Sequence, residues 1–159
     1  MPKPSGILPL ALVVVVMACS SGAPPAGTIP TVDDALRMLD RAVDLARARD
    51  FEGLCSLGDG NCRRHLEMAG RDAIPPDPPV VVGTRTMPTT TTAGDQMHMG
   101  GIVLILCGID ANGDHYDSEM LVFHGGNGLE VINPIYWGRT RIGDSANPVT
   151  AETFPPVTC

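Results

Sequence analysis

The chain has 159 residues, with 18 acidic side chains against 11 basic ones, and a net charge of −7 at pH 7. This acidic balance argues against a nucleic-acid-binding protein, because the phosphate backbone needs cationic partners. It also argues against docking on anionic lipid through a polybasic patch. Only 4% of the residues are aromatic, so a core must rely on aliphatic side chains and methionine. The length suits one domain.

The first 18 residues predict an export signal. Lys3 and the α-amine supply a positive start, and an apolar stretch follows at residues 7–17. The stretch is too short for a membrane-spanning helix, and a small residue, Ala18, directly precedes Cys19. We therefore assign residues 1–18 to a signal peptide.

The run Val16-Met17-Ala18-Cys19 resembles the lipobox of bacterial lipoproteins. The resemblance implies cleavage before Cys19 and a thioether-linked diacylglycerol on its sulfur, with palmitate as an acyl group. Two acyl chains suffice for stable anchoring, so the expected partner is the cell membrane and the expected location its extracytoplasmic face. An ordinary secretory signal with an unrelated cysteine is the alternative.

Without Cys19, four cysteines remain, an even number that suits disulfides in an oxidising compartment. Cys55 and Cys62 flank a turn-rich loop that can bring its ends together at low entropic cost. We therefore predict a Cys55–Cys62 disulfide, which leaves Cys107 and Cys159 as the second pair. Zinc binding is the alternative, but the spacing does not match paired Cys-x2-Cys motifs.

A tether and three helices are expected next. Residues 19–31 are mostly small residues and proline, which predicts a flexible tether. Apolar residues then recur at helical spacing over residues 32–49, behind Thr31 as a suitable N-cap. A second helix is expected after Asp50, and a third at residues 62–68.

The chain after the proline-rich segment at residues 74–79 is typical of β-structure. We predict strands at residues 80–86, 101–109, 116–124 and 129–137, with turns at 110–114 and 125–128. Helices followed by antiparallel strands predict an α+β fold, with N-terminal helices packed on a curved antiparallel sheet of about four strands. Residues 32–159 would form this single domain, including an irregular C-terminal tail.

This order of elements resembles the nuclear transport factor 2-like (cystatin-like) superfamily. The resemblance rests on the long first helix, on residues 48–54 (Ala-Arg-Asp-Phe-Glu-Gly-Leu), and on a closing meander that ends at residues 128–133 (Gly-Leu-Glu-Val-Ile-Asn). Small actinobacterial lipoproteins are often similar, and the absence of lysine after Lys3 suits a GC-rich genome. The proline-rich segment, a long threonine loop and the tail depart from the pattern and leave the number of strands open.

The resemblance implies an apolar pocket between the concave face of the sheet and the first helix. Leu104, Ile105, Phe123 and Trp137 are the candidates to line it. We therefore expect a binding or interaction domain of the cell envelope, without enzymatic activity and without a cofactor. Its partner would be an envelope protein or a small apolar ligand.

An enzyme with an acid/base pocket is one alternative. His115 and Asp117 lie two residues apart on a predicted strand, so they share a face and could form half of a general acid/base site. Charged residues beside a turn are more often simply solvated. The acidic turn at residues 110–114 does not predict calcium, because glycine and glutamate are missing from the sixth and twelfth positions of an EF-hand loop.

A copper-handling lipoprotein is the other alternative. Met97-His98-Met99 offers thioether and imidazole ligands, although methionine packing accounts for the same residues. We predict no bound metal. The adjacent threonine run, Thr89, Thr90, Thr91 and Thr92, could carry O-linked sugars or could be a plain polar loop.

Overall fold

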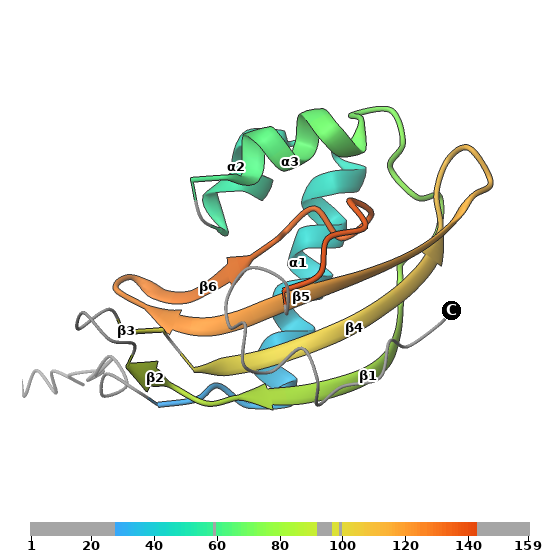
Figure 1. The fold of residues 1–159 in the computed structure, drawn as a ribbon. Helices are drawn as coiled ribbons and strands as arrows, with labels where there is room; N and C mark the ends of the chain where they lie inside the picture. The colour runs from blue at the N-terminus through green and yellow to red at the C-terminus, as the bar shows by residue number, and fades with distance from the viewer. Residues whose placement is uncertain (1–27, 59, 92–96, 99, 143–159) are drawn as a thin grey trace, which may run out of the picture.

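Three helices and a four-stranded antiparallel sheet form an α+β fold, which confirms the predicted class (Figure 1). The structure is a computed structural model, and it describes residues 28–58, 60–91, 97–98 and 100–142. The predicted signal peptide, most of the tether and the C-terminal tail lie outside these residues.

The first helix, α1 (Val32–Arg47), begins at a capping box. The amide of Asp34 donates to the Thr31 hydroxyl at 3.1 Å, and the amide of Thr31 donates to the Asp34 carboxylate at 2.9 Å. The hydroxyl and the amide of Thr31 together lower the pKa of Asp34. After the helix, Arg49 adopts a left-handed conformation with φ 56°, which turns the chain into the next helix.

Two short helices follow where the sequence predicts them. Helix α2 (Phe51–Ser56) is capped by Asp50, whose carboxylate accepts from the amide of Gly53 at 2.8 Å. Helix α3 (Cys62–Ala69) ends at Gly70, where a φ of 82° favours glycine. In Figure 1, α2 and α3 lie together beyond one edge of the sheet, and α1 runs across the face of the sheet.

The main sheet has the order β1-β4-β5-β6, with antiparallel neighbours throughout. Its strands are β1 (Val80–Met87), β4 (Gly101–Ile109), β5 (His115–Gly125) and β6 (Gly128–Ile132). The first three strands and the two hairpin turns lie where the sequence predicts them. A separate pair of two-residue strands, β2 (Thr90–Thr91) and β3 (Met97–His98), replaces part of the loop expected at the threonine run.

The last strand is shorter than predicted, since β6 ends at Ile132 and not at residue 137. Asn133 turns the chain out of the sheet with a φ of 63°. Its side-chain nitrogen donates to the Glu119 carbonyl at 2.6 Å and to the Ser118 hydroxyl at 3.2 Å. The side chain thus satisfies the Glu119 carbonyl of β5, which an extended β6 could not do because the next residue, Pro134, has no N–H.

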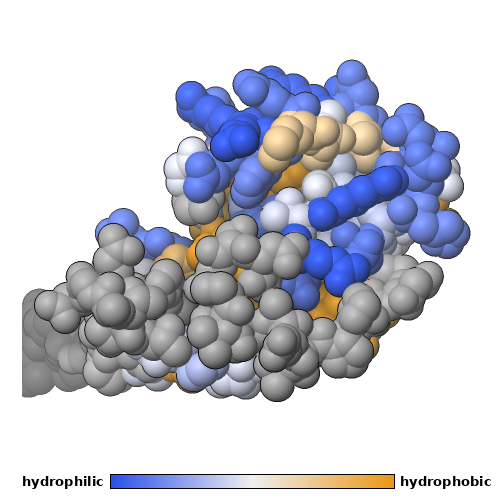
Figure 2. Space-filling model, in the orientation of Figure 1, coloured by the Kyte–Doolittle hydropathy of each residue, from blue (hydrophilic) through white to orange (hydrophobic). Residues whose placement is uncertain are grey.

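The two central strands, β4 and β5, bury side chains on both faces of the sheet. Alternate residues of β4 and β5 meet α1 and the residues after β6 in the main core. The opposite face holds a smaller apolar cluster, made of Val103, Leu121 and Ile142 with Met87, Phe123 and Ile132 around it. The outer surface of α2 and α3 is mostly hydrophilic, and apolar atoms are visible between these helices and the sheet (Figure 2).

Candidate functional site

The four residues predicted to line a pocket lie on two different faces of the sheet. Leu104 and Trp137 belong to the main core, where they are 0% and 3% exposed. Phe123 packs on the opposite face, and Ile105 lies there too because it follows Leu104 along the strand. The structure therefore does not bring the four side chains to one site.

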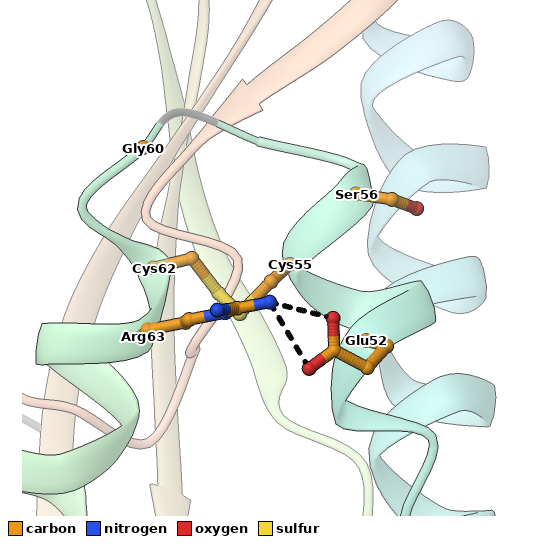
Figure 3. A pocket seen from close by; sticks show the side chains of 6 residues that line it. All are labelled: Glu52, Cys55, Ser56, Gly60, Cys62 and Arg63. Atoms are coloured by element: carbon orange, nitrogen blue, oxygen red, sulfur yellow. Dashed lines mark hydrogen bonds and ion pairs between the residues drawn. A yellow bond between two sulfur atoms is a disulfide. The ribbon is translucent and has the colours of Figure 1, made fainter.

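A first surface depression surrounds the disulfide, with a volume of about 410 Å³ (Figure 3). Cys55 and Cys62 are bonded, which confirms this half of the predicted framework. The guanidinium of Arg63 reaches across to the Glu52 carboxylate at 2.9 Å, but both side chains are more than 70% exposed. An ion pair so open to solvent contributes little to stability.

The second predicted disulfide is only partly visible. Cys107 is disulfide-bonded, and it lies on β4. Its predicted partner, Cys159, lies outside the described residues, so the Cys107–Cys159 pairing stays a prediction. The lipidation site Cys19 also lies outside them.

A second depression, which we call the β6 groove, lies between α1, the loop after α2 and the β5–β6 hairpin. Its volume is about 300 Å³, and it is lined by Arg41, Ser56, Leu57, Gly58, Asn127, Leu129 and Glu130. One end is closed by backbone pairing, because the amide of Val131 donates to the Leu57 carbonyl at 2.8 Å. Gly58 forms a parallel bridge with Val131 beside it.

Glycine is needed at position 58 for this approach. A side chain there would bring its Cβ within 2.6 Å of the Val131 carbonyl oxygen and 3.1 Å of the Pro134 ring. Gly58 therefore lets the loop lie against the edge of β6. The sequence analysis did not predict the groove, because its lining residues come from three separate segments of the chain.

Two tyrosines are enclosed in the core with no hydrogen-bond partner for either hydroxyl among the described residues. Tyr116 is 1% exposed and Tyr136 is 0% exposed. Burial raises the pKa of both, that of Tyr136 to about 12. Trp137 packs edge-on against Tyr136 with 5.0 Å between ring centres, and it donates to the Gly70 carbonyl at 3.2 Å. These side chains hold the end of the core together and are closed to solvent.

The candidate acid/base pair is not arranged for catalysis. His115 is exposed, and the Asp117 carboxylate accepts a hydrogen bond from Arg141. The acidic turn is accounted for by its own backbone, because Asp110 accepts from the amides of Asn112 and Asp114 at 2.9 and 3.1 Å. Within the described ranges, no three His, Cys, Asp or Glu side chains lie close enough together to hold a metal ion.

The candidate copper and glycosylation residues are only partly described. Met97 and His98 form β3, while Met99 lies outside the described residues. Thr89 is exposed, and its hydroxyl accepts from the amide of Gly100 at 3.0 Å. Thr90 and Thr91 form β2, and Thr92 also lies outside the described residues.

Comparison with known proteins finds no matching family model, no matching curated protein and no matching solved structure. None of the helices in the described part of the chain has the length and apolar character needed to cross a bilayer. Function has therefore to be inferred from the residues and their geometry.

Proposed function

We propose that this chain is a lipid-anchored lipoprotein of the extracytoplasmic membrane face, whose domain binds a partner in the cell envelope without catalysing a reaction. The observation that carries the location is the Cys55–Cys62 disulfide. Disulfides persist in oxidising compartments and are rare in the cytosol, so the bond supports export. The apolar stretch at residues 7–17 and the lipobox-like run before Cys19 support it independently.

Binding is favoured over catalysis because the carboxylates of β5 are already engaged in ion pairs and hydrogen bonds. Asp117 is engaged by Arg141, and Glu119 is held between Arg85 at 2.7 Å and the amide of Ile142 at 2.9 Å. Carboxylates satisfied in this way are poor candidates for a general base. The order of a long helix and a curved antiparallel meander also supports the resemblance to the nuclear transport factor 2-like superfamily, whose members we take as the guide to a binding role.

The anchor is tested by expressing the full chain in a bacterium and identifying its mature N-terminus by mass spectrometry. We expect an N-terminal Cys19 that carries a diacylglycerol, on a protein that high salt does not release from membranes and detergent does. The Cys19→Ala variant should stay unprocessed or appear in the soluble fraction, whereas a Ser20→Ala control should behave like the wild type. A mature N-terminus at another residue, or an unmodified Cys19, would refute the anchor.

A further inference from the structure

We propose that the β6 groove binds an extended peptide that carries a carboxylate, which adds to the edge of β6 and pairs with Arg41. This assignment rests on the binding function proposed above and names the class of its partner. It requires two features of the groove, a free stretch of strand edge and an unpaired positive charge.

The free strand edge is inferred from the geometry of an antiparallel ladder, in which the backbone groups of successive residues point alternately toward and away from the neighbouring strand. Val131 faces Val122 across β5, yet its amide donates away from β5, to Leu57. Its backbone groups therefore point outward, and those of Leu129 do the same two residues earlier. No hydrogen bond in the described part of the chain uses these outward groups of Leu129. Leu129 is one of the residues that line the groove.

The loop residues already show how this edge is used. Leu57 and Gly58 occupy the position of a fifth strand beside Val131 and run parallel to β6. A peptide in the groove would continue the same pairing at Leu129, about 7 Å further along the edge. Such strand addition takes its affinity from main-chain hydrogen bonds, and side-chain contacts add selectivity. Leu129, which is only partly buried, offers an apolar contact for the peptide.

The charge comes from Arg41, which projects from α1 into the lining of the groove. Of the ten arginines in the chain, eight have an acidic, carbonyl or aromatic partner shown by the described residues, and Arg41 is not among them. Its neighbours Asp40 and Asp44 on α1 do not pair with it. A free guanidinium beside open strand edge suits a peptide carboxylate, with which it can form two parallel hydrogen bonds.

Glu130 is the acidic group that could oppose such a ligand. It lies between Leu129 and Val131, which both contact the main core, so its side chain is directed to the other face of the sheet. There it accepts from the amide of Asn127 at 3.5 Å. Glu130 thus lines the groove from the side away from α1, and Arg41 is the only basic residue among the groove's lining residues.

The test measures fluorescence polarisation of a labelled peptide, Thr-Val-Thr-Val with a free C-terminus, against the full chain purified in detergent. We expect saturable binding, about fivefold tighter than that of the C-terminal amide, which is the effect of one partly exposed charge pair. The Arg41→Gln variant should remove this difference. Hydrogen exchange should show added protection at the amide of Leu129 when the free acid is bound.

Arg64 provides a matched control, because it is an exposed arginine on α3 outside the groove. The Arg64→Gln variant should keep the preference for the free acid. A peptide with methylated backbone nitrogens should not bind, since it cannot donate to the strand edge. Absence of saturation, equal binding of acid and amide, or equal loss in both arginine variants would overturn the assignment. These outcomes are independent of the Cys19 anchor, which mass spectrometry tests separately.

Discussion

Asn133 is a single residue that decides the path of the chain. It is fully buried, and its side chain donates to both Ser118 and Glu119 of β5. Its left-handed backbone conformation is one that asparagine tolerates better than most residues. The residues that follow enter the core instead of extending β6.

Replacing Asn133 should therefore be costly. We expect Asn133→Ala to lower the free energy of unfolding by about 3 kcal/mol, from two lost hydrogen bonds and the strained backbone. Asn133→Gly should cost about 1 kcal/mol less, because glycine accepts a positive φ without strain. Denaturant unfolding measures both, and the exposed Asn127→Ala serves as a control with a change under about 0.5 kcal/mol. Equal costs for the alanine and glycine variants would contradict this account.

The buried tyrosines make stability depend on alkaline pH. Their pKa values are raised by burial, that of Tyr136 to about 12, so the folded protein keeps protons that the unfolded chain loses near pH 10. Stability is therefore full below pH 10 and falls as the pH rises towards 12. Tyr116 and Tyr136 are the only tyrosines in the chain, which isolates their effect.

The stability of the Tyr136→Phe variant should fall less steeply with rising pH than that of the wild type. Between pH 10 and 11, we expect the free energy of unfolding of the variant to fall by about 1 kcal/mol less than that of the wild type, because a tyrosine of the unfolded chain is only half ionised at pH 10. Removing the hydroxyl should change stability little at pH 7, because the described residues leave it without a hydrogen-bond partner. Urea unfolding at fixed pH measures the slope, and identical slopes for the two proteins would refute the effect.

Among the elements, α1 combines the clearest sequence signal with the clearest role. The predicted stripe faces the sheet, where Leu39 and Val43 are buried and Leu36 packs at the margin of the core. Arg41 lies on the exposed side. The helix therefore supplies one wall of the main core and, from its other side, the charge of the β6 groove.

Truncating Leu39 to alanine should cost about 2–5 kcal/mol, because it removes buried methyl groups and leaves a cavity. Arg41→Ala should cost less than about 0.5 kcal/mol, as for other exposed positions. Denaturant melts with the disulfides intact compare the two variants. Equal costs would mean that α1 is not packed on the sheet as described.

At the scale of the whole molecule, covalent links complement a core with few aromatic side chains. Cys55–Cys62 ties α2 to α3, while Cys107 lies in a strand that is buried on both faces. A bond from Cys107 to Cys159 would connect the last residue to the centre of the sheet. It would close a loop long enough to stabilise the fold by about 4 kcal/mol through the entropy of the unfolded chain.

Peptide mapping without reduction should recover both links, Cys55–Cys62 and Cys107–Cys159. The second link follows from the even number of cysteines that remains after Cys19 is lipidated. Recovery of Cys107 joined to Cys19 would contradict both the pairing and the lipid anchor. A free thiol at Cys159 would contradict the pairing alone.

By itself, the sequence determined the features that depend on local chemistry. Helical spacing and caps located α1 to α3, and the β-branched runs with their turns located β1, β4 and β5, because these signals lie within a few residues of one another. The Cys55–Cys62 pair could be predicted for the same reason, since only a short loop separates its members.

The tertiary structure decided what depends on residues far apart in the chain. Asn133 ends β6 early because its side chain reaches β5, a contact that no local pattern encodes. Because successive side chains of a strand alternate between the two faces of the sheet, Ile105 and Phe123 lie on one face and Leu104 on the other. The predicted lining residues therefore do not meet. The β6 groove forms only where α1, the loop at Gly58 and β6 converge, because its shape is a property of packing and not of any one segment.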